Sequence, residues 1–108
     1  MSSPEANSSW HFLTSHTQVL LAIQRDPDVR LRDVAVTVGI TERAAQRIVN
    51  DLVAAGYVER ERVGRRNRYV VNTQVHMRHP EQVEHEIGEL LDVLRSEPRE
   101  SDAVSETE

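Results

Sequence analysis

The 108 residues of this chain suffice for one domain with a single hydrophobic core. With 38% hydrophobic and 29% charged residues the composition is that of a globular protein, and the absence of cysteine excludes disulfides, thiolate metal sites and cysteine nucleophiles. The longest apolar run, residues 19–23, is far too short for a membrane span, and no signal-peptide pattern precedes it, so we expect a cytoplasmic protein.

The net charge of −5 is unevenly distributed along the chain. Residues 11–72 contain ten arginines and seven acidic residues, whereas residues 73–108 contain three arginines and ten acidic residues. The chain has no lysine, and arginine is the better bidentate donor to phosphate and guanine. Because the local charge decides whether a surface attracts nucleic acid, the negative total does not exclude such a partner.

The chain opens with residues 1–9, which contain serine, proline and asparagine and are expected to be a disordered arm. Trp10 and Phe12 follow, and the sequence leaves open whether they pack on the core or against a second subunit. A first helix is expected over about residues 16–25, with Ser15 as its N-cap. Its apolar face consists of Val19, Leu20 and Ile23.

Residues 26–28, Asp-Pro-Asp, end this helix because proline cannot continue it. Residues 29–31 are compatible with a very short strand. A second helix is expected over about residues 32–38, and Gly39 can end it because glycine adopts a left-handed conformation without a Cβ clash.

Thr41 can cap a third helix, expected over about residues 42–55, and Gly56 is a natural stop for it. The apolar side chains of this stretch are spaced to lie on the inner sides of two crossing helices. They are Val34, Ala35, Val38, Ile40, Ala45 and Ile48. Two helices joined by such a turn resemble the helix-turn-helix of DNA-binding proteins.

The spacing of apolar residues changes after Gly56. Residues 57–63 and 68–71 alternate partly as strands do, and the intervening Gly64-Arg65-Arg66-Asn67 has turn composition. This predicts a β-hairpin with a charged tip. A helix-turn-helix followed directly by such a hairpin resembles the winged helix fold, over about residues 15–72.

The chain further resembles small bacterial regulators of the MarR and ArsR type. In that group a leucine near the end of the recognition helix is followed by a glycine, an apolar pair and the wing, and Leu52, Gly56, Tyr57 and Val58 fit this order. The resemblance implies one winged helix-turn-helix domain over residues 10–75, mainly α with a small β-hairpin (α+β), and an added C-terminal helix.

Residues 76–95 are predicted to form that C-terminal dimerisation helix. Pro80 suits the first helical position, and an apolar stripe with heptad-like spacing needs burial. Burial on the same domain would give a monomer, and burial against a second copy, the interpretation we prefer, gives a two-fold dimer. The acidic residues 96–108 are expected to be a disordered tail. The predicted dimer interface is Val83, Ile87, Leu90, Leu91 and Leu94.

The third predicted helix carries a polar face with the chemistry of major-groove recognition. Arginine can fork to guanine, glutamine and asparagine can pair with adenine, and glutamate can accept from cytosine. A solvated helix face is the alternative, but this face lacks the Glu-Lys pairs typical of one. The predicted DNA-binding residues here are Thr41, Glu42, Arg43, Ala44, Gln46, Arg47 and Asn50.

The predicted wing carries five arginines over residues 60–68. Those near the tip could enter the minor groove or hold phosphates. Glu59 and Glu61 alternate with two of the arginines, so part of this charge can pair across the strands instead. The predicted DNA contacts of the wing are Arg65, Arg66 and Arg68.

Other functions find little support in the sequence. His76, His79 and His85 lie near glutamates, but ArsR-type relatives commonly sense metals through cysteines in the second helix of the motif, and residues 31–38 have none, so we predict no metal and no cofactor. No phosphate loop, nucleophile elbow or paired-carboxylate motif appears, which predicts that the chain is not an enzyme. No pattern marks a pocket for a small-molecule effector.

The sequence therefore predicts a homodimeric regulator of transcription that binds double-stranded DNA sequence-specifically. The alternative is a winged-helix protein-interaction adaptor that does not bind DNA directly. No pattern in the sequence identifies the operator, the target genes, or the direction of regulation.

Overall fold

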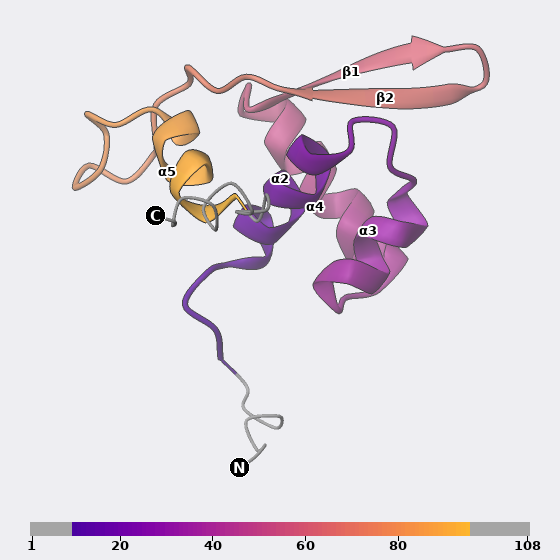
Figure 1. Cartoon of the computed structure of the whole chain (residues 1–108), viewed down its shortest axis with the longest axis horizontal. Coiled ribbons are helices and arrows are strands. Elements are labelled where there is room, and N and C mark those ends of the chain that lie inside the picture. Colours follow the sequence, from indigo (N-terminus) through magenta and orange to yellow (C-terminus); the bar gives the residue numbers. More distant parts are fainter. Residues whose placement is uncertain (1–9, 96–108) are drawn as a thin grey trace, which may run out of the picture.

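The computed structural model describes residues 10–95, so the segments expected to be disordered, residues 1–9 and 96–108, lie outside the described residues. Figure 1 shows helices packed beneath a long hairpin, with the C-terminal helix near the opposite end from the hairpin turn. The elements are α2 (Ser15–Arg25), α3 (Leu31–Val38), α4 (Glu42–Ala54), β1 (Val58–Val63), β2 (Arg66–Val71) and α5 (Ile87–Leu94). This confirms the predicted α+β winged helix architecture.

Helix α2 begins one residue before the predicted start, and its cap is Thr14 rather than Ser15. The Thr14 hydroxyl oxygen accepts a hydrogen bond from the Thr17 amide at 3.2 Å, which satisfies one of the free amides of the first turn. The short strand considered for residues 29–31 is not formed. Leu31 already belongs to α3, and the Pro27 carbonyl ahead of it accepts a hydrogen bond from the Tyr69 amide of β2 at 3.0 Å.

The turn between α3 and α4 forms as predicted. Gly39 has a φ of +85°, and its amide donates to the Ala35 carbonyl at 2.8 Å. Thr41 caps α4 by accepting a hydrogen bond from the Ala44 amide at 3.0 Å. The left-handed glycine therefore ends α3 and turns the chain, so that α4 begins three residues later, at Glu42.

The hairpin has a tighter turn than predicted. Val58 pairs with Val71 and Val63 pairs with Arg66, so only Gly64 and Arg65 remain as the turn. Gly64 has a φ of +63° and Arg65 does not have a positive φ, which is the pattern of a type II′ turn. The prediction that Arg66 belongs to the turn is wrong: it is the first residue of β2, because the type II′ turn needs only two residues.

One hydrophobic core joins the helices and the base of the hairpin. Its most deeply buried side chains come from α2, α3, α4, the start of β1 and α5. Each of these side chains contributes about 1.5–3 kcal/mol of burial free energy. The outer half of the hairpin is exposed and projects beyond this core (Figure 1). These buried side chains are Val19, Ile23, Val34, Val49, Val58 and Leu91.

The C-terminal region departs most from the prediction. The helix expected over residues 76–95 begins only at Ile87, and residues 76–86 form turns. His76 donates from Nδ1 to the Val83 carbonyl at 2.7 Å, and the Met77 amide donates to the His85 carbonyl at 3.0 Å. Hydrogen bonds between residues 76–77 and residues 83–85 of the same chain therefore replace the helical ones that Pro80 was expected to start.

The apolar stripe of this region turns inward. Ile87 and Leu91 are 7% and 0% exposed within a single chain, and Leu90 and Leu94 are half-buried. Val83 is exposed and lies outside α5. The predicted place in a dimer interface is wrong for Ile87 and Leu91, because they fill the core of their own chain. For Val83, Leu90 and Leu94, which keep exposed surface, it stays a prediction.

Two contacts hold residues 73–88 against the domain. The buried Tyr57 hydroxyl donates to the His76 carbonyl, and burial raises the pKa of Tyr57. The Gly88 amide donates to the Thr73 carbonyl at 2.9 Å.

Within residues 10–95, no helix has the length and apolar character needed to cross a membrane.

Replacing Gly88 with alanine should destabilise the fold. A Cβ at this position would lie 2.8 Å from both the Cβ and the carbonyl oxygen of Thr73, so the chain must shift. We expect a loss of about 1–3 kcal/mol in the free energy of unfolding, measured by urea denaturation. Val93→Ala is the matched control, because Val93 is 80% exposed on the same helix and should change the value by under about 0.5 kcal/mol. Equal midpoints for both variants would contradict the close contact.

The ion pair between His85 and Glu89 should be visible in the titration of the imidazole. His85 Nδ1 donates to Glu89 Oε1 at 2.8 Å. This hydrogen bond, followed by the charge of Glu89, raises the pKa of His85, and the same hydrogen bond lowers the pKa of Glu89. The pair's contribution is present below the ordinary histidine pKa and is lost as pH rises through the raised one. At the acid end it is lost as pH falls through the lowered pKa of Glu89.

Glu89→Gln should therefore lower the pKa of His85, measured by NMR titration. Glutamine keeps an oxygen that can accept from the Glu86 amide, which Glu89 caps at 3.0 Å, so the helix start is preserved. Glu84→Gln should have a smaller effect, because Glu84 acts on His85 through charge alone. An unchanged His85 titration in Glu89→Gln would show that the pair does not form in solution.

Candidate nucleic-acid interface

Helix α4 is divided into a buried face and a polar, hollowed face. Ala45, Ile48, Val49 and Leu52 are buried, and the polar residues between them are exposed. A shallow hollow of about 530 Å³ lies over the polar face. The structure therefore brings together five of the predicted DNA-binding residues on one surface. The hollow is lined by Leu31, Glu42, Arg43, Gln46, Arg47 and Asn50.

The two other predicted residues of this region have different surroundings. Thr41 is exposed, and its hydroxyl oxygen is used by the helix cap, which leaves the hydroxyl hydrogen free to donate. Ala44 is half-buried. Glu42 lies in the first turn of α4, where a carboxylate is favoured by the helix dipole.

A second hollow, of about 420 Å³, joins α4 to the wing. It shares Leu31 and Gln46 with the first hollow and is also lined by Arg66 and Tyr69 of β2. The helix face and the hairpin therefore border one continuous concave surface. Arg30, the residue before α3, lines it as well and was missed by the sequence analysis. The signal that could have found it was its positive charge, two residues ahead of the predicted second helix.

Asn50 is engaged within the protein. Its Oδ1 accepts hydrogen bonds from Gln46 Nε2 at 3.1 Å and from Arg60 Nη2 at 2.8 Å. A bidentate pairing with adenine needs an amide's acceptor as well as its donor, so Asn50 in this arrangement is better suited to hold Arg60. Gln46 donates one hydrogen to Asn50, and its Oε1 accepts no hydrogen bond from residues 10–95.

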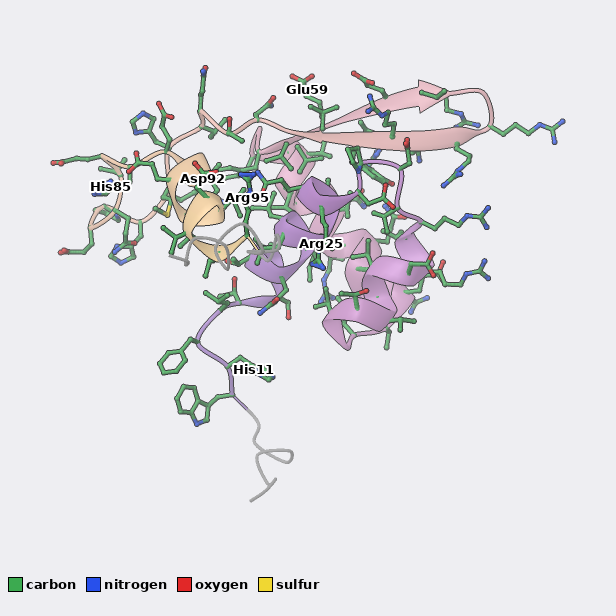
Figure 2. The ribbon with its side chains drawn as sticks, viewed as in Figure 1. His11, Arg25, Glu59, His85, Asp92 and Arg95 are labelled. Atoms are coloured by element: carbon green, nitrogen blue, oxygen red, sulfur yellow. The ribbon has the colours of Figure 1, made fainter. Side chains whose placement is uncertain are left out.

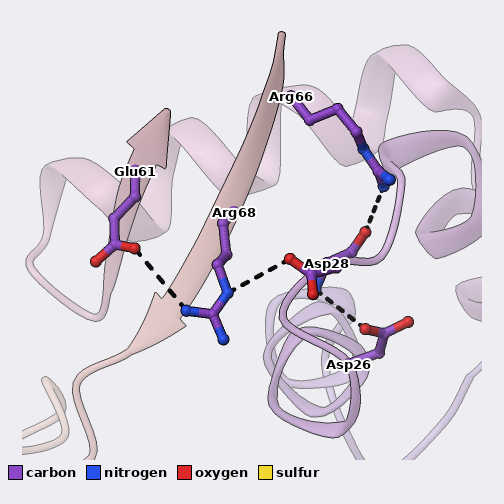
Figure 3. Close-up of polar contacts among 5 residues, drawn as sticks. All are labelled: Asp26, Asp28, Glu61, Arg66 and Arg68. Atoms are coloured by element: carbon purple, nitrogen blue, oxygen red, sulfur yellow. Dashed lines mark hydrogen bonds and ion pairs between the residues drawn. The ribbon is translucent and has the colours of Figure 1, made fainter. Parts of the chain in front are cut away.

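The wing arginines have separate surroundings. Arg65 lies in the exposed turn and forms no hydrogen bond or ion pair with the part of the chain that the structure describes. Arg62 donates from Nε to the Gly64 carbonyl at 3.1 Å, which steadies the turn. Arg66 donates from Nη2 to the Asp28 carbonyl at 2.7 Å, and Figure 3 shows it pointing back to the segment before α3.

Arg68 braces the wing through two carboxylates. Its guanidinium lies 3.4 Å from Asp28 and 4.0 Å from Glu61, the residue opposite it in the hairpin (Figure 3). Asp28 is itself fixed by a hydrogen bond from its amide to the Asp26 carboxylate at 3.0 Å. The three predicted wing contacts therefore divide into one unpaired charge at the tip, Arg65, and two arginines tied to the body of the domain, Arg66 by a hydrogen bond and Arg68 by an ion pair with Asp28.

Acidic side chains collect at the other end of the molecule. Glu81, Glu84 and Glu86 lie in the segment that leads into α5, and Glu89 lies in the first turn of α5. Figure 2 shows His85 of this segment at the opposite end from the hairpin turn. The asymmetry of charge along the sequence is thus an asymmetry in space. A polyanion would be attracted to the hairpin end and repelled from the α5 end.

The three C-terminal histidines form local contacts. His76 donates to Val83, His79 Nδ1 accepts from the Glu81 amide at 3.0 Å, and His85 pairs with Glu89. Within residues 10–95 no three side chains of the metal-binding types are grouped in a way that could hold an ion.

The comparison with known families decides the assignment. The model of the MarR family matches residues 13–68, which include the helix-turn-helix and most of the wing. The chain belongs to the MarR family. This family consists of DNA-binding transcriptional regulators rather than enzymes. The match ends within β2, so the rest of β2 and helix α5 lie outside the part that resembles the MarR-family model. No curated protein matches the chain significantly.

Asn50→Ala should loosen the wing without DNA present. The substitution removes the acceptor of Arg60, a hydrogen bond of about 0.5–1.5 kcal/mol, so amide exchange over residues 60–69 should accelerate by up to about ten-fold. Gln46→Ala is the control, because it removes the Gln46–Asn50 bond and leaves the Arg60–Asn50 bond in place. Identical exchange in the two variants would argue against a bracing role for Asn50.

Proposed function

We propose that this MarR-family chain binds double-stranded DNA sequence-specifically and regulates transcription as a homodimer. The observation that carries the proposal is the continuous concave surface bordered by α4, the start of α3 and the wing. The exposed side chains that line it are arginines, Gln46, two asparagines and one glutamate, Glu42, and the opposite face of α4 is buried in the core.

In this proposal α4 enters the major groove with its N-terminal half toward the bases. Recognition helices generally contact base edges through these residues. Arg43 and Arg47 can fork to guanine O6 and N7, and Gln46 can pair with adenine, each good pairing discriminating by about 1–3 kcal/mol. Asn50, farther along the helix, positions Arg60 and contributes to recognition indirectly.

The wing supplies a contact that does not depend on sequence. Arg66 and Arg68 tie the hairpin to the turn before α3, so that the unpaired Arg65 is held at a defined place beyond the core. A guanidinium there can hold phosphates or enter the minor groove. The bracing arginines therefore contribute mainly by orienting the wing, whereas Arg65 contributes charge.

A homodimer would place two copies of α4 on successive half-sites, about 34–36 Å apart on one side of the duplex. A two-fold axis is the usual symmetry of such dimers. The acidic α5 end of each copy, repelled by the phosphates, is expected to face away from the DNA.

The division of labour predicts different outcomes for two substitutions. Arg65→Ala should weaken binding to all sequences equally and reduce the slope of log K against log salt by about 1, because one phosphate contact is lost. Gln46→Ala should weaken binding to the preferred sequence by about 1–3 kcal/mol and leave other sequences almost unchanged. Fluorescence titrations on a sequence selected from random DNA and on a scrambled one, at two salt concentrations, measure both.

Arg95→Ala is the matched control for charge, because Arg95 follows α5 and pairs with Asp92 at 3.6 Å, away from the wing (Figure 2). It should leave both affinities unchanged. If the unsubstituted protein binds no DNA at moderate salt, the chain is an adaptor and the proposal fails. Equal losses on both sequences for Gln46→Ala would overturn its assignment to base recognition.

A further inference from the structure

Two large aromatic side chains at the start of the described chain are left without a partner in their own domain. Trp10 and Phe12 are 66% and 91% exposed, and their rings pack edge to face with centroids 5.2 Å apart. Figure 2 shows the arm that carries them, marked by His11, running away from the helices. The sequence left open whether these residues belong to the core or to a subunit contact, and their exposure excludes the core.

The same chain contains a groove with an apolar floor. Its volume is about 690 Å³, in the range of sites that hold organic ligands, and it lies between the start of α2, the end of α4 and residues 77–90. Leu20, Leu52 and Leu90 contribute to the floor, and the pair of His16 and Asp51, 3.0 Å apart, lies at the rim. The sequence did not predict this groove because three segments distant in the sequence form it.

We propose that Trp10 and Phe12 of one copy insert into this groove of a second copy, and that the exchange is reciprocal. The proposal rests on the proposed homodimer and names the contact that forms it. Reciprocal insertion is isologous, so it closes at two copies.

The backbone at Thr14 favours a second copy over the chain's own groove. Thr14 is extended, with φ −73° and ψ 165°, and its carbonyl and hydroxyl are both bonded into the first turn of α2. The direction of the arm is therefore fixed where it leaves the helix. The arm runs away from the helices (Figure 2), and neither Trp10 nor Phe12 lines the groove, although Thr14 lies at its edge.

The areas agree with a stable interface. From their exposed fractions, Trp10 and Phe12 together present about 350 Å² on each arm. Two arms and the groove walls that they cover would bury about 1,400 Å², within the roughly 1,200–2,000 Å² of specific protein complexes. Asp51 and Leu52 belong to α4, so the inserted arm would also fix the distance between the two copies of this helix.

Trp10 is the single tryptophan of the chain, so its fluorescence reports on the arm directly. In a dilution series followed by light scattering, we expect its emission to move to shorter wavelength as the mass doubles from 12.3 kDa. Leu90→Arg, which places a charge in the groove, should keep the emission at long wavelength and the mass at that of one chain. Val36→Arg is the matched control, because Val36 is 76% exposed on α3, and it should behave as the unsubstituted protein.

Mixing two variants tests exchange between copies. Trp10→Ala/Phe12→Ala removes only exposed side chains and keeps the groove, whereas Leu90→Arg keeps the arm and blocks the groove. Neither should dimerise alone, and the mixture should form a mixed dimer through one arm, with the emission of Trp10 moving to shorter wavelength only on mixing. If Leu90→Arg fails to fold, the double variant alone must still abolish dimerisation.

Three results would overturn the proposal. Short-wavelength emission at every concentration with the mass of one chain would mean that the arm occupies its own groove. Long-wavelength emission from a species of doubled mass would leave the homodimer standing and remove the arm from its interface. A mass of one chain with long-wavelength emission at every concentration would exclude both the homodimer and the insertion of the arm into any groove. The DNA titrations are read separately, so their failure would not be confused with any of these.

Discussion

The burial of one face of α4 is the constraint on which the rest of the structure depends. Val49 and Ala45 have no exposed surface, and Ile48 and Leu52 have almost none, so the helix cannot rotate without exposing aliphatic surface to water. The opposite face is then necessarily directed outward. The turn at Gly39 and the cap at Thr41 set where this helix begins, which determines which polar residues fall on the outward face.

The wing shows how charge can be used for position as well as attraction. Asp28 compensates Arg68 and its carbonyl accepts from Arg66, so two arginines of the wing are held by the protein itself. Exposed ion pairs contribute little stability, usually under about 1 kcal/mol. Their consequence here is geometric, because they connect the outer hairpin to the segment before α3 and leave Arg65 as the cation at the turn. A partner that competes for these arginines would also release the wing.

The apolar stripe near the C-terminus is buried in its own domain, whereas the aromatic side chains near the N-terminus are exposed. The C-terminal stripe has the spacing of an interface, yet Ile87 and Leu91 complete the core of their own domain. Residues 10–14 have no apolar periodicity, yet they carry the most exposed aromatic surface of the described residues. An aliphatic stripe can be buried against any accessible apolar surface. Residues 72–86 return the chain to the domain, so Ile87 and Leu91 join one core with residues of α2 and α4. The arm leaves a capped helix end in a fixed direction and has no such route.

The sequence by itself determined the elements whose signals are local. The glycine turn, the caps, the alternation of the hairpin and the amphipathic pattern of α4 act over a few residues, and the helix-turn-helix, the wing and the face of Gln46 followed from them. Only the tertiary structure decided which predicted residues are unpaired, since the bonds of Asn50 with Arg60, of Arg66 with Asp28 and of Gly88 with Thr73 join segments distant in sequence. It also decided that α5 starts at Ile87 and packs inward. The physical reason is that a side chain's partner is chosen by proximity in space, which spacing along the chain does not record.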